Sequence, residues 1–277
     1  MTFLEKLANA QRRTNSMLCI GLDTDWRTVP EFLHRAENPV LAFNRAIIDA
    51  TKEFACAYKL NIAYYEAFGE AGINAIHRTL SRIPSHIVTI ADVKRNDIGN
   101  TCDQYAFTYQ DYFTFDAMTI NPLMGFDSVE PFLRREDRGV FFLGLTSNPG
   151  ARDFEYLELK NGKRLYEEIT DKVLEWNKPG SNCGLVVGAT KPEELKALRE
   201  RVPELPFLIP GIGAQGGSLE AVLKANGNGT ALINVSRAIA GASRNEDFAE
   251  AAAHAAEGFV KQMRELAPQL KNELVPA

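Results

Sequence analysis

The sequence predicts a single-domain (β/α)8 TIM barrel that covers residues 1–277. Eight short runs of apolar or β-branched residues alternate along the chain with longer stretches of helical spacing. The length of 277 residues is close to the value of about 250 that such barrels occupy as one unit. No stretch rich in Pro, Gly and Ser divides the chain, which argues against a linker between two domains.

The predicted strands are continuously apolar and do not alternate between apolar and polar residues. This pattern is typical of parallel strands that are covered by helices on both faces of the sheet. Eight such units favour a closed barrel over an open doubly wound sheet. The strands are expected at residues 17–22, 55–60, 87–93, 117–120, 140–145, 185–187, 207–209 and 231–235.

Helical spacing follows most of these strands, and some of the helix ends are marked. Pro192 and Ser218 are typical of helix starts, and Asn226 with Gly227 is typical of a helix end. Residues 1–16 are expected to form an N-terminal helix, and residues 268–277 a frayed C-terminal tail. The main helices are expected at residues 39–52, 66–82, 165–176, 192–201, 218–225 and 247–266.

Composition restricts the classes of partner. Lys and Arg number 31 against 36 Asp and Glu, and the net charge of −5 argues against a nucleic-acid-binding protein. The longest apolar runs are far too short to cross a bilayer, so no membrane partner is expected. The four cysteines are scattered without a C-x-x-C pair, as in a reducing compartment, and a cytoplasmic location is expected. An anionic ligand would therefore need a local cluster of positive charge.

Charged residues stand at the ends of the first three strands. Asp23 follows the first strand, Lys59 ends the second, and Asp92 and Lys94 end the third, with Asp97 just beyond. Residues two apart on a strand share a face, so the third strand should direct a carboxylate and an ammonium group into the barrel mouth. Active sites of such barrels lie at these strand ends. The cluster is therefore a candidate site; the alternative is an ion pair that only fills the mouth.

The loops after the seventh and eighth strands predict a phosphate site. Gly216 and Gly217 lead into the helix start at Ser218, where free backbone N–H groups suit an anion. Arg237 follows the eighth strand and adds a guanidinium group with the geometry of a phosphate ligand.

The same loop spells G-x-G-x-x-G through Gly211, Gly213 and Gly216, which leaves a dinucleotide site as an alternative. A dinucleotide fold would place an acidic residue after the next strand, about twenty positions on. Here Arg237 stands in that place, which suits NADP at best. An NADP-dependent oxidoreductase is therefore the less favoured hypothesis.

The segment TSNPG at residues 146–150 follows the fifth strand and begins a long polar stretch. It is either a surface loop or a lid with a hydroxyl that contacts a ligand. No spacing of His, Cys and carboxylate residues indicates a zinc site, and no Ser/His/Asp arrangement indicates acyl transfer. No metal is expected.

The motifs, taken in order, resemble the orotidine 5′-phosphate decarboxylase family. The run DVKRNDI at residues 92–98 matches the family signature D-x-K-x-x-D-[IV], and LCIGLD at 18–23 resembles its first-strand motif. The segments NPLMGFDS at 121–128, TSNPG at 146–150 and PGIGAQGG at 210–217 resemble the longer bacterial subgroup, known as type 2. The resemblance runs from the first strand to the eighth and so covers nearly the whole chain.

The resemblance implies decarboxylation of orotidine 5′-monophosphate to UMP and CO2, the last step of de novo pyrimidine biosynthesis, without a metal or organic cofactor. Lys94 would donate the proton to the ring carbon that loses CO2. By the same resemblance, the alternating charged set is Lys59, Asp92, Lys94 and Asp97, and the substrate is bound by Asp23, Lys59, Thr101, Ser147, Gln215, Gly216, Gly217 and Arg237.

The resemblance also implies a homodimer in which Asp97 and Thr101 reach into the partner's site. One departure concerns the second strand, where many members have proline after the lysine and this chain has Leu60. Three alternatives remain from the residues: a Mg2+-dependent sugar-phosphate decarboxylase or aldolase of the same barrel group, the NADP-dependent oxidoreductase, and a phosphate-binding barrel without activity.

Overall fold

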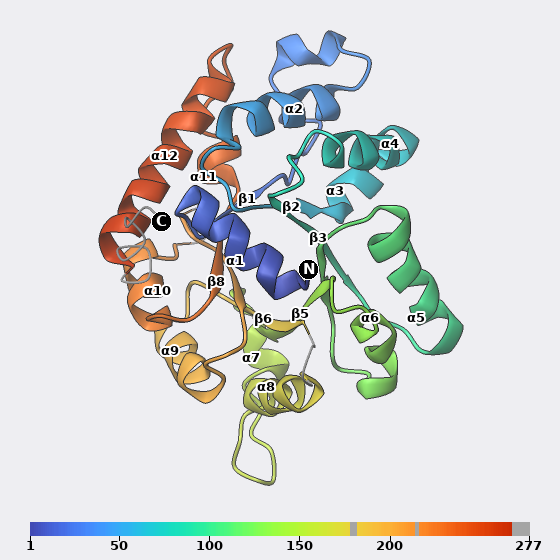
Figure 1. Cartoon of the computed structure of the whole chain (residues 1–277), viewed down its shortest axis with the longest axis vertical. Coiled ribbons are helices and arrows are strands. Elements are labelled where there is room, and N and C mark those ends of the chain that lie inside the picture. Colours follow the sequence, from blue (N-terminus) through green and yellow to red (C-terminus); the bar gives the residue numbers. More distant parts are fainter. Residues whose placement is uncertain (178–181, 214–215, 268–277) are drawn as a thin grey trace.

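The computed structural model describes residues 1–177, 182–213 and 216–267. Eight parallel strands form a closed barrel in sequence order, and β1 pairs with β8 to complete it (Figure 1). The (β/α)8 fold is therefore confirmed. The strands are β1 (Leu18–Gly21), β2 (Ala57–Asn61), β3 (Val88–Arg95), β4 (Ala117–Ile120), β5 (Gly139–Leu145), β6 (Cys183–Val187), β7 (Phe207–Pro210) and β8 (Ala231–Val235).

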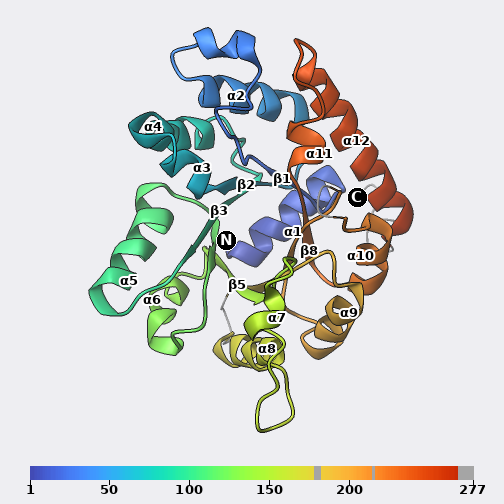
Figure 2. The same ribbon diagram turned by 180° about the vertical axis from the view of Figure 1, so that it is seen from behind.

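Helices surround the barrel in a ring, as Figures 1 and 2 show from opposite sides. The helix starts expected at Pro192 and Ser218 are confirmed, and the Ser218 side chain accepts a hydrogen bond from the Ala221 N–H. The longer helices are α1 (Phe3–Thr14), α2 (Pro39–Thr51), α4 (Gly69–Leu80), α5 (Gly99–Ala106), α8 (Leu165–Trp176), α9 (Pro192–Arg201), α10 (Leu219–Asn226) and α12 (Phe248–Leu266). Shorter turns are η1 (Glu31–Arg35), α3 (Ile62–Glu66), η2 (Phe107–Tyr112), η3 (Phe126–Ser128), α6 (Glu130–Leu133), α7 (Ala151–Phe154) and α11 (Arg237–Ala240).

Two helical regions differ from the expectation. The helix expected at 66–82 is α4, which begins only at Gly69 and ends at Leu80, whereas Glu66 is the last residue of α3; Gly69 has a positive φ of 63°, which separates the two helices. Helix α5 and the π-helical turn η2 after β3 were not predicted, since residues 99–112 are rich in polar side chains and lack a clear apolar stripe. Residues 268–277, expected as a tail, lie outside the described residues.

The N-terminal end of the barrel is closed by α1, which crosses it in Figure 1. Phe3 and Leu7 of this helix are buried among inward-facing residues of the strands, including Val88 and Ile90. The rings of Phe3 and Phe141 pack edge to face with their centres 5.9 Å apart. With this end filled, the opening of the barrel lies at the C-terminal ends of the strands.

All four cysteines are buried and unpaired, as expected of small apolar fillers. In the part of the chain that the structure describes, no helix has the length and apolar character needed to span a membrane.

Candidate active site

A cavity of about 840 Å3 opens at the C-terminal ends of the strands. Six of the predicted site residues line it: Asp23, Lys59, Asp92, Lys94, Ser147 and Arg237. The lining also includes Asp25 and Arg244, so four cationic side chains face three carboxylates. A chain with a net charge of −5 thus has a cavity with a surplus of positive charge.

Four side chains in this cavity form a row of alternating charge. The Lys59 ammonium donates to Asp92 Oδ2 at 2.8 Å and to Asp23 Oδ1 at 3.4 Å. The Lys94 ammonium donates to the other Asp92 oxygen at 2.5 Å. The row therefore runs Asp23, Lys59, Asp92, Lys94 across β1, β2 and β3, which are neighbours in the barrel.

Burial strengthens the coupling within this row. The Lys59 side chain is 4% exposed, and its burial alone would lower its pKa, but the Asp23 and Asp92 carboxylates raise that pKa overall. Burial would likewise raise the pKa of Asp92, yet the two neighbouring ammonium groups hold this pKa well below its usual range. Both groups are therefore charged at neutral pH. Lys94 at the outer end of the row is about half exposed and faces the cavity.

The backbone at Lys94 differs from the regular strand that the sequence predicts. Ala91 pairs with Met118 and Arg95 pairs with Ile120, so three residues of β3 lie opposite the single residue Thr119 of β4. Lys94 itself has a φ of 49°, a conformation that few residues other than glycine adopt. Lys94 and Asp92 meet as expected, but through this bulge and not through strand alternation.

The loop after β5 brings Ser147 to the cavity. Both carboxylate oxygens of Glu155 accept hydrogen bonds from Thr146, one from its N–H and one from its hydroxyl, each at 2.7 Å. Gly188 after β6 lies against the Ser147 backbone, where a Cβ atom would come within 2.8 Å of the Ser147 nitrogen. These contacts fix the segment that carries Ser147.

The loop after β7 supplies the other side of the cavity through Pro210, Gly211 and Ile212. The Gly217 N–H donates to the Gly211 carbonyl oxygen at 3.1 Å, which folds the loop back before α10 begins. Gly216 has a φ of 85°, as a turn of this kind requires. Arg237, at the first position of α11, faces the same space.

Some predicted residues do not meet the cavity. Asp97 accepts a hydrogen bond from the N–H of Ile98, and Thr101 is exposed on α5. Neither of them lines the cavity of its own chain, and neither do Gly216 and Gly217. Gln215 lies outside the described residues.

Sequence reasoning missed several polar residues that line the cavity, namely Asn61, Tyr64, Thr119, Asn234 and Ser236. Two of these residues could have been predicted from the sequence. Thr119 and Asn234 are polar residues inside otherwise apolar strands, in phase with the inward face. Gly21 shows how closely this layer packs, because a Cβ atom there would lie 1.9 Å from the Ser236 hydroxyl oxygen.

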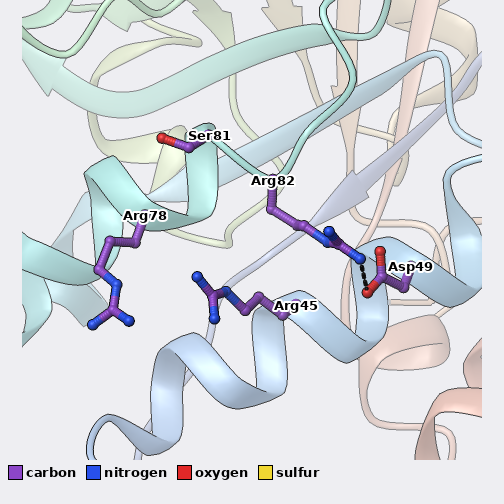
Figure 3. Close-up of a pocket in the computed structure, with 5 residues that line it drawn as sticks. All are labelled: Arg45, Asp49, Arg78, Ser81 and Arg82. Atoms are coloured by element: carbon purple, nitrogen blue, oxygen red, sulfur yellow. Dashed lines mark hydrogen bonds and ion pairs between the residues drawn. The ribbon is translucent and has the colours of Figure 1, made fainter.

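A second pocket of about 430 Å3 lies between α2 and the end of α4 (Figure 3). Arg45, Arg78, Arg82, Ser81 and Asp49 line it, and Arg82 forms an ion pair with Asp49 at 2.5 Å. It contains none of the predicted site residues. The candidate active site is therefore the cavity at the strand ends.

Comparison with known proteins shows the family to which this chain belongs. Residues 16–253 match the Orotidine 5'-phosphate decarboxylase / HUMPS family. An orotidine 5'-phosphate decarboxylase of Herpetosiphon aurantiacus is 48% identical over 259 residues, which cover 93% of this chain and 96% of that protein. One of Haloarcula marismortui is 44% identical over 278 residues, 99% of each chain. The solved OMP decarboxylase of Leishmania donovani has a TM-score of 0.81 and 37% identity, covering 96% of this chain and all of that one. The chain belongs to the orotidine 5'-phosphate decarboxylase / HUMPS family.

Proposed function

We propose that this protein is a carboxy-lyase that converts orotidine 5′-monophosphate to UMP and CO2, without a metal or organic cofactor, as the last step of de novo pyrimidine biosynthesis. The observation that carries the proposal is the row of alternating charge from Asp23 to Lys94 at the mouth of the barrel. Relatives at 43–48% identity named orotidine 5'-phosphate decarboxylase support it over nearly the whole chain.

Lys94 is the residue that we assign to the chemical step. When the bond between the pyrimidine ring and the carboxylate breaks, its electron pair stays on the ring carbon, which has no adjacent electron sink. An ammonium group held beside this carbon stabilises the developing negative charge and then delivers a proton to it. Lys94 is suited to this role because it is anchored on Asp92 and also faces the cavity.

Asp92 contributes through its fixed negative charge. The two lysines keep this carboxylate ionised in a nearly buried position, where it would face the carboxylate of the substrate. Two like charges about 4 Å apart repel each other by roughly 4 kcal/mol at an effective dielectric constant near 20. Loss of CO2 relieves this repulsion, so part of the binding energy of the phosphate can be used to tolerate it.

The remaining groups are assigned to substrate binding. Asp23 and Lys59 bind the ribose hydroxyls, and Ser147 binds the edge of the pyrimidine. Arg237 binds the phosphate. Its guanidinium group faces the cavity and forms no ion pair with another of the described residues, so it is available to an anionic ligand. Gln215, Gly216 and Gly217 of the loop after β7 complete the phosphate and base contacts in this proposal.

An absorbance assay with orotidine 5′-monophosphate, run with and without EDTA, tests the function. We expect the pyrimidine spectrum to change to that of UMP at equal rates in both samples. Activity that EDTA abolishes would favour the Mg2+-dependent sugar-phosphate decarboxylase or aldolase. Hydride transfer with NADP would favour the oxidoreductase.

We also propose a homodimer whose two sites are shared, in a cytoplasmic protein. Three apolar side chains beside the Asp97 loop are at least half exposed: Ile98, Leu123 and Met124. Exposed apolar side chains that lie together are typical of a surface that a partner subunit covers. The Asn96 side chain joins this loop to the loop after β4 by donating to the Asn121 carbonyl oxygen. Asp97 and Thr101, which miss the cavity of their own chain, would reach the partner's cavity from here. The buried, unpaired cysteines suit a reducing cytoplasm.

Mixing two inactive variants tests the shared site. In a hybrid of Lys94→Ala and Asp97→Asn chains, one of the two sites carries neither substitution. If chains exchange freely, the mixture should regain roughly one quarter of the wild-type activity, because half of the dimers are hybrids with one intact site. A mixture that stays inactive although hybrids form would contradict the shared site, and sedimentation velocity would report the dimer itself.

A further inference from the structure

Thr119 lies on β4 beneath the charged row and is 1% exposed. Its hydroxyl donates to Asp92 Oδ1 at 2.9 Å and accepts from the backbone N–H groups of Val93 and Lys94, at 3.0 and 3.1 Å. A threonine hydroxyl has one donor and two acceptor positions, so all three are in use. This one side chain therefore contacts the backbone of Lys94 and the carboxylate to which Lys94 is anchored.

The bulge in β3 explains why a hydroxyl is needed at this position. Between the pairs Ala91–Met118 and Arg95–Ile120 the regular ladder is interrupted, and the Thr119 hydroxyl supplies an acceptor for two N–H groups there. A buried N–H group without an acceptor would be strongly unfavourable. The bulge also requires the positive φ of Lys94, which persists only where its surroundings hold it.

The Asp92 carboxylate is oriented by the same contact. Lys59 donates to Oδ2, while Lys94 and Thr119 both donate to Oδ1. Of these three donors, only the hydroxyl of Thr119 is uncharged and carried on a short, buried side chain, in strand β4. It therefore gives the carboxylate a fixed direction that two flexible lysine side chains do not give by themselves.

We propose that Thr119 is a positioning residue for the decarboxylation: its hydroxyl holds Lys94 in the bulged backbone conformation and sets the direction of Asp92. This inference rests on the proposed function. It is separable from a purely structural role, because a buried hydroxyl that served stability alone would leave the turnover of the folded enzyme unchanged.

The test compares four variants of the full-length protein. Thr119→Val keeps the shape and removes the hydroxyl, whereas Thr119→Ser keeps the hydroxyl. Thr119→Ala serves with the serine variant as a second pair that differs only in the hydroxyl. The control is Thr170→Val in α8, a fully buried threonine whose hydroxyl donates only to the Tyr166 carbonyl oxygen at 2.8 Å.

We expect kcat of Thr119→Val to fall about 10- to 100-fold, since a misplacement of about 1 Å can reduce turnover 100-fold. KM for orotidine 5′-monophosphate and the affinity for UMP should change less than about threefold, because the ribose and phosphate contacts remain. Thr119→Ser should recover most of the wild-type kcat, and Thr170→Val should match the wild type per folded molecule.

Two outcomes overturn the inference. The first is that the wild type is active and the Thr119→Val variant is folded but has the same kcat as the wild type. The other is loss of the folded state, by circular dichroism, in both hydroxyl-free variants, which assigns the hydroxyl to stability alone. If instead the valine variant alone fails to fold, the ratio of kcat between the serine and alanine variants decides. A wild type that does not act on orotidine 5′-monophosphate refutes the proposed function itself, which separates the two failures.

Discussion

The two ends of the barrel each bury a carboxylate with a lysine partner, and they use the pair differently. At the N-terminal end, Asp116 accepts from Lys6 of α1 at 2.6 Å and from the N–H and hydroxyl of Thr89, at 2.9 and 3.0 Å. At the C-terminal end, Asp92 accepts from Lys59, Lys94 and Thr119. Both carboxylates are about one-tenth exposed.

The difference lies in what surrounds the lysine. Lys6 is 18% exposed and belongs to the helix that closes the barrel, so its ion pair with Asp116 holds α1 in place. Lys94 is 49% exposed and borders the cavity, so its ammonium group can meet a ligand while it stays anchored. An ion pair between an aspartate and a lysine thus stabilises the fold at one end of the barrel, and at the other end a second such pair is available for chemistry.

Replacing the lysine at the mouth should give the largest effect. Lys94→Ala removes both the cation beside the reacting carbon and the proton donor, so kcat should fall by at least about 1,000-fold. The midpoint of urea unfolding and the affinity for UMP should stay near the wild type, because the side chain is half exposed. An unchanged rate constant for decarboxylation in a single-turnover assay would refute the assignment of Lys94.

A smaller effect is expected from the cation at the phosphate end of the cavity. Arg237→Ala should raise KM for the nucleotide about 10- to 100-fold, the size of a lost hydrogen bond to a charged group. The phosphate-free nucleoside provides the control, since the variant and the wild type should process it equally slowly. A variant that distinguishes nucleotide from nucleoside as well as the wild type does would contradict a phosphate contact at Arg237.

The lysine at the closed end should affect stability and not turnover. Lys6→Met should lower the free energy of unfolding by about 1–2 kcal/mol, because Asp116 remains nearly buried with one donor fewer. Lys172→Met, which breaks the exposed pair with Glu175, is the matched control and should lower it by less than about 1 kcal/mol. A change of kcat in Lys6→Met would show that the two ends are coupled.

The sequence was most informative where burial is complete. All eight strands lie where continuous apolar runs predict them. A strand that is covered on both faces has apolar side chains on both sides, so its run of apolar residues is not interrupted by polar ones. The charged residues at three strand ends also identified the cavity that the structure shows. The bulge of β3 at Lys94 could not be predicted, because it depends on the register between β3 and β4, where three residues of β3 lie opposite Thr119. The helix and strand propensities of a short segment do not contain information on such a contact between two strands.

The helix that closes the barrel sets an order on folding. Its first residues pack against β5, where a Cβ atom on Gly139 would lie 2.5 Å from the Phe3 ring, and Gln11 near its other end donates to the Ala231 carbonyl oxygen of β8 at 2.7 Å. Ala231 follows Gln11 by 220 positions, so most of the chain lies between these two contacts. Helix α1 can therefore complete its packing only after the eighth strand has been synthesised, so it is among the last elements of the barrel to reach its final place.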